Sequence, residues 1–218
     1  MRKTMPAFFG IAFAFCLAPL FGDTVTPTPT PAAGKTVVFL GDSLTAGLGV
    51  QPAEAFPALL AEKIRAAGLP FEVQNAGLSG DTSAGGARRI DWLLQRRIDV
   101  LVVELGANDG LRGLELKSMK ANLQAIIDKT KAKNPQVKIV LAGMQVPPNL
   151  GADYADGFQR VFAELAKENN ATLIPFLLEG VGGRRDLNQP DLIHPSAAGH
   201  RVVADLVWRS LEPVLRQP

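Results

Sequence analysis

The sequence predicts an α/β fold, a three-layer αβα sandwich built around a parallel β-sheet. Five short apolar runs alternate with longer segments whose apolar residues recur at helical spacing. The runs are apolar throughout rather than at every second position, which is typical of strands buried on both faces. Right-handed crossovers between such strands place helices on both faces of the sheet.

The first half of the folded region supplies two strands and two helices. TVVFLG at 36–41 is β-branched and apolar, which favours a buried strand. Residues 52–68 have helical spacing and stop at Gly68, a common residue after a helix. FEVQNAG at 71–77 is expected to be a second, less apolar strand, and residues 84–97 a second helix.

The second half repeats this alternation. DVLVVELG at 99–106 is the strongest strand signal, and the next helix ends before Asn134-Pro135, since the residue preceding proline disfavours helical geometry. The other expected elements are helices at 114–133, 153–170 and 196–215 and strands at 137–143 and 171–176.

The start of the chain is expected to lie outside this domain. Residues 1–23 have a basic start followed by an apolar run, the layout of a signal peptide, although the residues do not define its cleavage site. The Thr/Pro alternation of residues 24–35 indicates a linker, so the domain is placed at 36–218. We therefore expect a periplasmic or secreted protein with no stable membrane anchor after signal removal.

Composition excludes several classes of protein. The 218 residues are 47% hydrophobic and 20% charged with a net charge of +2, which is typical of a globular protein and argues against a nucleic-acid binder. Cys16 is the only cysteine and lies in the expected signal peptide, so no disulfide or thiol nucleophile is expected. Nothing in the sequence demands more than a monomer.

The carboxyl ends of the strands are where a ligand site is expected, because open parallel sheets bind ligands there. The first strand runs into Gly41-Asp42-Ser43. Ser43 has a structural interpretation as a helix cap and a functional one as a nucleophile, whose weakly reactive hydroxyl needs a base.

The base has two candidates, since the chain contains only two histidines. His194 precedes Pro195, which favours an extended loop, whereas His200 falls in the last expected helix, where we expect it to be solvated. Asp191, three residues before His194, can accept a hydrogen bond from Nδ1–H and orient the ring. A turn residue is the alternative role for Asp191.

An ester hydrolase also needs donors for the oxyanion that forms on the attacked carbonyl. The amides of Ser43 and Gly77 and the side chain of Asn108 all follow strand ends. The structural alternatives are a strand-end turn for Gly77 and an Asx-turn for Asn108.

Four blocks of the sequence resemble the SGNH (GDSL) hydrolases, from about residue 36 to the end. They are Gly41-Asp42-Ser43-Leu44, Gly77 in NAGLSGDTS, Gly106-Ala107-Asn108-Asp109 and Asp191-Leu192-Ile193-His194. NAGLSGDTSAGG, LVVELGANDGLRG and IPFLLEGV resemble in particular the bacterial branch of arylesterases, acyl-CoA thioesterases and lysophospholipases.

This resemblance implies a flavodoxin-like sheet of order 2-1-3-4-5 and hydrolysis of esters or thioesters without metal or organic cofactor. It implies Ser43 as nucleophile, His194 as base and Asp191 as its orienting residue, with Ser43, Gly77 and Asn108 as oxyanion donors. Aryl or alkyl esters of short-to-medium acyl chains are the expected substrates, with thioesters and lysophospholipids as further candidates.

The acyl pocket is less well defined by sequence. The Pro- and Gly-rich segment 143–158 is expected to cover the crevice, with Met144, Val146, Pro147 and Leu150 as candidate walls and GLRG at 110–113 as a second wall. Packing of these apolar residues on the core is an equally weighted alternative.

Two other functions remain open at this point. A carbohydrate or peptidoglycan O-deacetylase would require aromatic groups in the crevice, but Trp92 and Trp208 fall in expected helices. A non-enzymatic flavodoxin-like binding module would explain the sheet and leave Ser43, Asp191 and His194 without a role.

Overall fold

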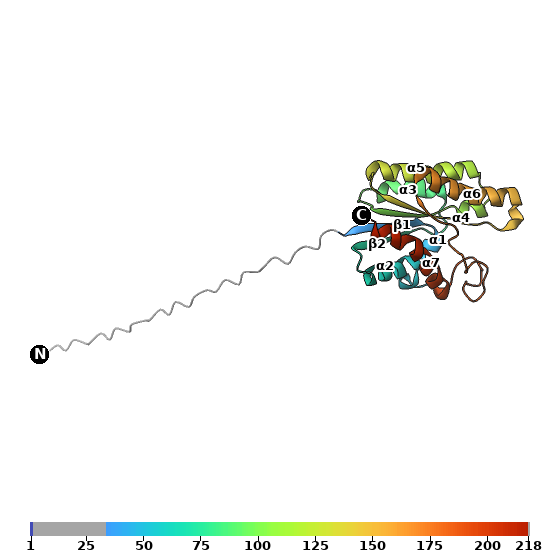
Figure 1. Cartoon of the computed structure of the whole chain (residues 1–218). Coiled ribbons are helices and arrows are strands. Elements are labelled where there is room, and N and C mark those ends of the chain that lie inside the picture. The colour runs from blue at the N-terminus through green and yellow to red at the C-terminus, as the bar shows by residue number, and fades with distance from the viewer. Residues whose placement is uncertain (2–33, 218) are drawn as a thin grey trace. The chain divides into compact units, whose positions relative to one another are not determined.

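The structure, a computed structural model, describes Met1 and residues 34–217 (Figure 1). The expected signal peptide, apart from Met1, and the linker up to residue 33 lie outside the described residues. Among the residues that are described, no helix is long and apolar enough to span a membrane.

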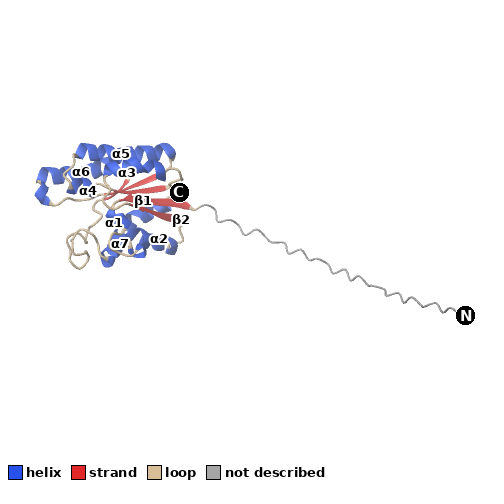
Figure 2. Cartoon of the chain, turned by 180° about the vertical axis from the view of Figure 1, so that it is seen from behind, coloured by secondary structure: helices blue, strands red, loops and turns tan. Residues whose placement is uncertain are grey.

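The sheet contains five parallel strands in the order β2-β1-β3-β4-β5, which confirms the predicted fold class. Figure 2 shows this sheet between two helical layers. The strand bounds are β1 Lys35–Gly41, β2 Phe71–Gly77, β3 Val100–Glu104, β4 Lys138–Ala142 and β5 Thr172–Ile174.

The long helices divide between the two faces of the sheet (Figures 1 and 2). On one face lie α2 (Phe56–Ala66) and α7 (Ala197–Arg216). The other is covered by α3 (Ser83–Leu93), α5 (Leu116–Lys133) and α6 (Ala152–Asn169). Each begins and ends within a few residues of its expected bounds.

Short helices directly after two strands were not predicted. They are α1 (Ser43–Ala46) after β1 and α4 (Ala107–Leu111) after β3. There are also two 3₁₀ turns: η1 at Pro52–Glu54 lies within the helix expected at 52–68, and η2 at Pro148–Leu150 was not predicted. One helical turn is too short to show a 3.6-residue period, so hydrophobic patterning cannot detect it.

The strand register brings the site residues to one edge of the sheet. Gly41 at the end of β1 is paired with Gly77 of β2 on one side and Glu104 of β3 on the other. The central strands are buried, and Phe39 packs edge-on against Phe56 of α2 with 5.7 Å between ring centroids. This rigid centre fixes the point from which Asp42 and Ser43 leave the sheet.

Candidate active site

The structure brings together Ser43, His194 and Asp191. Ser43 Oγ lies 2.9 Å from His194 Nε2, although 151 residues separate them in the chain. His194 Nδ1 lies 2.6 Å from Asp191 Oδ2. A hydroxyl, an imidazole and a carboxylate in this order have the arrangement of a nucleophile, its base and the group that orients the base.

Ser43 is held at the start of α1 by the residue before it. Asp42, and not Ser43, is the N-cap: its Oδ1 accepts a hydrogen bond from the Leu44 amide at 3.0 Å. Because Asp42 caps the helix, the Ser43 hydroxyl is left for His194. Ser43 is 9% exposed, so it is shielded and still reachable from the crevice.

Asp191 and His194 share a turn that is centred on the Asp191 carboxylate. Its Oδ1 accepts hydrogen bonds from the Ile193 and His194 amides, both at 3.0 Å. Leu192 has a left-handed backbone with φ of 59°, which costs about 1–2 kcal/mol in a non-glycine residue and is offset here by these bonds. The His194 amide, followed by its ring, lowers the pKa of Asp191 to about 2, so the carboxylate is ionised at neutral pH.

Gln189 links this turn by hydrogen bonds to the segment that follows Ser43. Its Nε2 donates to the Leu48 carbonyl at 2.6 Å and to the Pro195 carbonyl at 3.1 Å. Its backbone amide donates to the His194 carbonyl at 2.8 Å. The distance between Ser43 and His194 is therefore fixed from both sides of the crevice.

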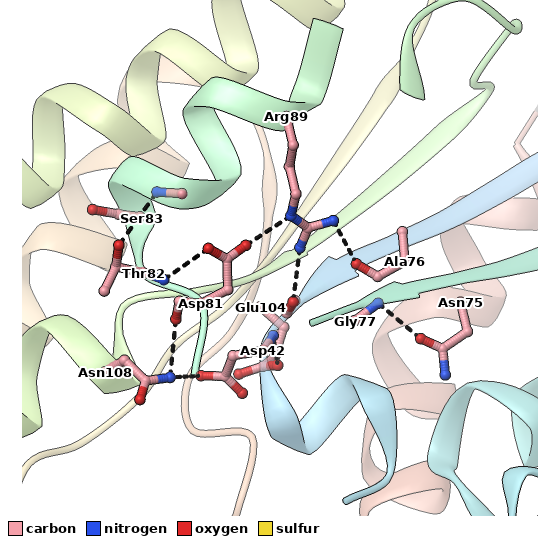
Figure 3. Close-up of polar contacts among 12 residues, drawn as sticks. Asp42, Asn75, Ala76, Gly77, Asp81, Thr82, Ser83, Arg89, Glu104 and Asn108 are labelled. Atoms are coloured by element: carbon pink, nitrogen blue, oxygen red, sulfur yellow. Dashed lines mark hydrogen bonds and ion pairs between the residues drawn. The ribbon is translucent and has the colours of Figure 1, made fainter. Parts of the chain in front are cut away.

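Gly77 does not fit its expected role as an oxyanion donor. Its amide already donates to Asn75 Oδ1 at 2.9 Å (Figure 3). A Cβ atom at Gly77 would lie 2.2 Å from the Ala46 amide nitrogen, so its missing side chain makes room for α1. The structure accounts for this glycine by packing at the end of β2.

Gly80 is the better candidate from the same sequence block. It has φ of 79° in a turn closed by a 3.0 Å bond from the Asp81 amide to the Leu78 carbonyl. Within the described part of the chain, the amides of Ser43 and Gly80 have no hydrogen-bond partner. NAGLSGDTS contains two glycines, and the sequence does not show which amide faces the crevice.

Asn108, at the start of α4, connects this turn to Asp42, the residue before Ser43. Its Nδ2 donates to Asp42 Oδ2 at 3.0 Å and to the Asp81 carbonyl at 2.9 Å (Figure 3). Asn108 also lines the same cavity as Ser43 and His194. Both N–H groups of the Asn108 amide are therefore used in these contacts, so a substrate oxygen would have to share one of them.

Arg89 of α3 fastens this region to the sheet. Its guanidinium donates to Asp81 Oδ2 at 2.7 Å, to the Ala76 carbonyl at 2.8 Å and to the Gly41 carbonyl at 2.9 Å (Figure 3). One planar side chain thus joins the ends of β1 and β2 to the turn that contains Gly80. The adjacent Arg88 is exposed, so the two neighbouring arginines of α3 differ in their surroundings.

The cavity beside Ser43 and His194 has a volume of about 310 Å³. Met144, Val146 and Pro147 line it, as does Leu111 of the GLRG segment. Leu150 differs from the expectation: in the 3₁₀ turn η2 it packs against the hydrophobic core and is not a lining residue. Further lining residues that the sequence did not identify are Leu44, Ala107, Leu178, Leu192 and Ile193.

His200 is buried rather than solvated, contrary to expectation. It is 1% exposed, its Nδ1 accepts a hydrogen bond from the Phe56 amide at 3.3 Å, and its ring stacks on Phe56. Burial lowers the pKa of His200 to about 4, so the ring is neutral at physiological pH. In the described residues, no group of three or more His, Cys, Asp or Glu side chains is placed to hold a metal ion.

Comparisons with known proteins agree with this geometry. The profile of the GDSL-like Lipase/Acylhydrolase family matches residues 39–202. The esterase TesA of Pseudomonas aeruginosa is 40% identical over 185 residues, which cover 84% of this chain and 91% of that protein. Thioesterase 1/protease 1/lysophospholipase L1 of Escherichia coli is 37% identical over 84% of this chain and 86% of its own length.

A solved structure extends the similarity to three dimensions. The psychrotrophic esterase EstA from Pseudoalteromonas sp., in a structure inhibited by monoethylphosphonate, has a TM-score of 0.79 and 35% identity. The match covers 84% of this chain and 100% of that one. With the fold, the ordered blocks and these matches in agreement, the chain belongs to the GDSL-like lipase/acylhydrolase family and is a carboxylic ester hydrolase.

Proposed function

We propose that the protein is a serine esterase that acts through an acyl-enzyme on Ser43. The observation that carries this proposal is the hydrogen-bonded series from Ser43 Oγ to His194 Nε2, at 2.9 Å, and from His194 Nδ1 to Asp191, at 2.6 Å. It supplies an activated hydroxyl beside an apolar cavity.

In the first step, Ser43 Oγ bonds to the ester carbonyl carbon while its proton passes to His194 Nε2. The bond to the leaving oxygen or sulfur then breaks, and the alcohol or thiol takes that proton. In the second step, a water molecule gives a proton to His194 Nε2 and attacks the acyl carbon. The bond from that carbon to Ser43 Oγ then breaks, His194 returns the proton to Oγ, and the acid is released. Asp191 keeps Nδ1–H in place and stabilises the imidazolium that forms in each step.

The oxyanion is proposed to bind to three donors. The amides of Ser43 and Gly80 are unpartnered among the described residues, and the side-chain amide of Asn108 is held beside them by Asp42 and Asp81. Such donors act on charge that develops in the transition state, which is why their removal lowers the rate more than it weakens substrate binding.

The proposed substrates are aryl or alkyl esters of short-to-medium acyl chains, with thioesters and lysophospholipids as further candidates. The polar lining residues are Asp42, Ser43, Asn108, Gln145 and His194, and the rest of the cavity wall consists of Leu, Ile, Val, Ala, Met, Pro and Gly. Aliphatic walls suit an acyl chain and offer no aromatic platform for a sugar, so the O-deacetylase alternative gains no support. A periplasmic or secreted location and a monomeric state stay proposals, the former based on residues 1–23.

The test of the nucleophile is Ser43→Ala, compared with Ser118→Ala, which changes an exposed serine of α5. We expect Ser43→Ala to abolish hydrolysis of a chromogenic short-chain ester and labelling by a fluorophosphonate, with an unchanged circular dichroism spectrum. Because EstA is inhibited by a phosphonate, this probe suits the fold. Labelling of Ser43→Ala at the wild-type level would refute the proposal.

The acyl pocket is tested by a series of esters that differ only in acyl length. Replacing Leu178 by Trp reduces the cavity, so the variant should lose activity on medium chains while keeping activity on acetyl esters. A wild-type enzyme that accepts acetyl esters alone would contradict the proposed acyl groove.

A further inference from the structure

A carboxyl group that the mechanism above does not use lies directly behind the nucleophile. Glu104 ends the otherwise apolar strand β3 and is 0% exposed. Its strand neighbour is Gly41, where a Cβ atom would lie 2.6 Å from Glu104 Oε2. The glycine before Asp42 therefore makes room for a buried carboxyl group, which is expensive to bury in its charged form.

The hydrogen bonds of Glu104 account for only one of its oxygens. Oε2 accepts from the Asp42 amide at 3.2 Å and from Thr45 Oγ1 at 2.8 Å. In the described part of the chain, no donor reaches Oε1. The Asp42 carboxyl group is also buried, at 1% exposed, and it interacts with Glu104, whose Oε2 accepts the Asp42 amide. Two carboxyl groups in contact can form a hydrogen bond with each other only when one of them carries a proton.

The surrounding charges do not balance two carboxylates. The Arg89 guanidinium, which reaches this edge from α3, donates to Asp81 and to the carbonyls of Ala76 and Gly41. His194, in the loop before α7, interacts electrostatically with Asp42. On the face covered by α2 and α7, His200 is neutral at physiological pH. Thr45 of α1 is uncharged.

The electrostatics of the pair agree with these contacts. Burial raises the pKa of Glu104 well above its usual value, and the neighbouring Asp42 charge raises it further. Burial also raises the pKa of Asp42, against the opposing effects of its hydrogen bonds and of His194. Desolvation and a like-charged neighbour both favour one retained proton.

We propose that Glu104 and Asp42 share one proton in the folded enzyme, and that Glu104 is a positioning residue that acts through Asp42. The shared proton leaves a single negative charge on the pair. It also holds the Asp42 carboxylate so that Oδ1 accepts the Leu44 amide and Oδ2 accepts Asn108 Nδ2. The part of this proposal that concerns catalysis rests on the proposed function.

The proton matters to catalysis because the oxyanion forms at the same edge of the sheet. The Ser43 amide follows Asp42 directly, and Asn108 Nδ2 donates to the Asp42 carboxylate. A second negative charge behind these donors would oppose the oxyanion in a site of low dielectric constant. Loss of the proton at alkaline pH should therefore lower kcat, with a smaller effect on KM.

The direct test is infrared difference spectroscopy of the wild-type protein and Glu104→Gln at pH 7. We expect the carbonyl stretch of a protonated carboxylic acid in the wild-type protein and its absence in Glu104→Gln. Glu62→Gln, at an exposed position of α2, is the matched control and should keep the band. Absence of the band from the wild-type protein would overturn the proposal whatever the enzyme hydrolyses.

Folding equilibria give a second test that does not depend on activity. A carboxyl group whose pKa is higher in the folded than in the unfolded state stabilises less as pH rises above its unfolded value, since folding must then take up a proton. Relative to Glu104→Gln, the wild-type folding constant should fall about tenfold per pH unit above pH ~4.5 until the raised pKa is reached. A pH-independent ratio would contradict the shared proton.

Kinetics then test the catalytic part. The Gln amide can donate to Asp42 as the acid does, whereas Leu cannot, so Glu104→Gln should exceed Glu104→Leu at least tenfold in kcat. The alkaline decline of kcat in the wild-type enzyme should be absent from Glu104→Gln. If Glu104→Leu does not fold, the pH dependence of kcat in the wild-type enzyme and in Glu104→Gln still tests the catalytic part of the proposal. An infrared band in a protein that hydrolyses no ester would refute the proposed function and leave the shared proton in place.

Discussion

Two regions of the site use the same chemical group in opposite ways. On the rim, the Asp191 side chain is 45% exposed, and hydrogen bonds from His194 lower its pKa to about 2. Behind the nucleophile, Glu104 is 0% exposed, and burial raises its pKa well above the usual value. The number of donors decides the charge of the first carboxyl group, and desolvation decides that of the second.

The two regions also differ in how they are built. The rim turn, residues 191–194, is stabilised locally, because every hydrogen bond of the Asp191 carboxylate reaches a group within three residues. The network behind Ser43 joins residues about 60 positions apart, as in the contacts of Asp42 with Glu104 and Asn108. A local turn therefore orients the proposed base, whereas contacts across the sheet orient the proposed oxyanion donors.

Of the changes that test this comparison, the largest loss of activity is expected from a substitution in the rim turn. Asp191→Asn keeps the side-chain shape but removes the charge that stabilises imidazolium, so kcat/KM should fall about 10³–10⁴-fold. Steady-state hydrolysis of a chromogenic ester measures this. Asp186→Asn, an exposed carboxylate of the same loop that pairs with Arg184, is the control and should stay within twofold of the wild-type enzyme. A loss below tenfold in Asp191→Asn would mean that His194 does not depend on it.

The next largest loss of activity is expected from a substitution among the proposed oxyanion donors. Asn108→Ala removes the donor between Asp42 and Asp81, and kcat should fall about 10²–10³-fold with little change in KM. Asn122→Ala, which removes an amide bonded to Ser83 Oγ, is the matched control. A change confined to KM would assign Asn108 to substrate binding instead.

Arg89→Ala tests whether the network behind Ser43 depends on its link to the sheet. Three charge-assisted bonds are lost, so we expect about a tenfold fall in kcat/KM and a stability loss of about 1.5–3 kcal/mol. Urea unfolding and ester hydrolysis measure the two effects. Arg88→Ala, at the adjacent exposed position, should change stability by less than about 0.5 kcal/mol. Equal effects of the two variants would contradict the role of Arg89.

The effect expected to be smallest at neutral pH is that of buried His200, because it appears only in acid. Its folded pKa of about 4 lies below the ordinary 6.5, so its contribution is complete above pH 6.5 and is lost as pH falls towards 4. His200→Asn keeps an acceptor for the Phe56 amide but cannot titrate. Between pH 7 and pH 4, urea unfolding should show the wild-type protein losing up to about 3 kcal/mol more than this variant. If the free energies of unfolding of the two proteins change equally between pH 7 and pH 4, burial does not lower the pKa of His200.

Much of the architecture could be predicted because it depends on sequence neighbours. FEVQNAG was expected at 71–77, which are the bounds of β2, and the long helices were found through apolar spacing. The sheet order followed from the resemblance of four blocks. The contact of Asp191 with His194 was expected from a spacing of three residues.

Other features could not be predicted from neighbours. The choice between Gly77 and Gly80 depends on which amide is free, and Asn75 decides that by occupying the first. In the sequence, Glu104 is one polar residue at the end of an apolar run. Its hydrogen bonds with Asp42 and Thr45, about 60 positions away, exist only in the folded chain.

The order of strands and helices, the residues proposed as nucleophile, base and orienting carboxylate, and the turn that joins the last two could all be derived from the sequence. Which carboxyl and imidazole groups are buried, which backbone amides are available and which apolar residues line the cavity became clear only from the folded chain. Propensity and turn chemistry act over a few residues, whereas desolvation and hydrogen-bond partnership depend on residues that folding brings together from distant parts of the chain.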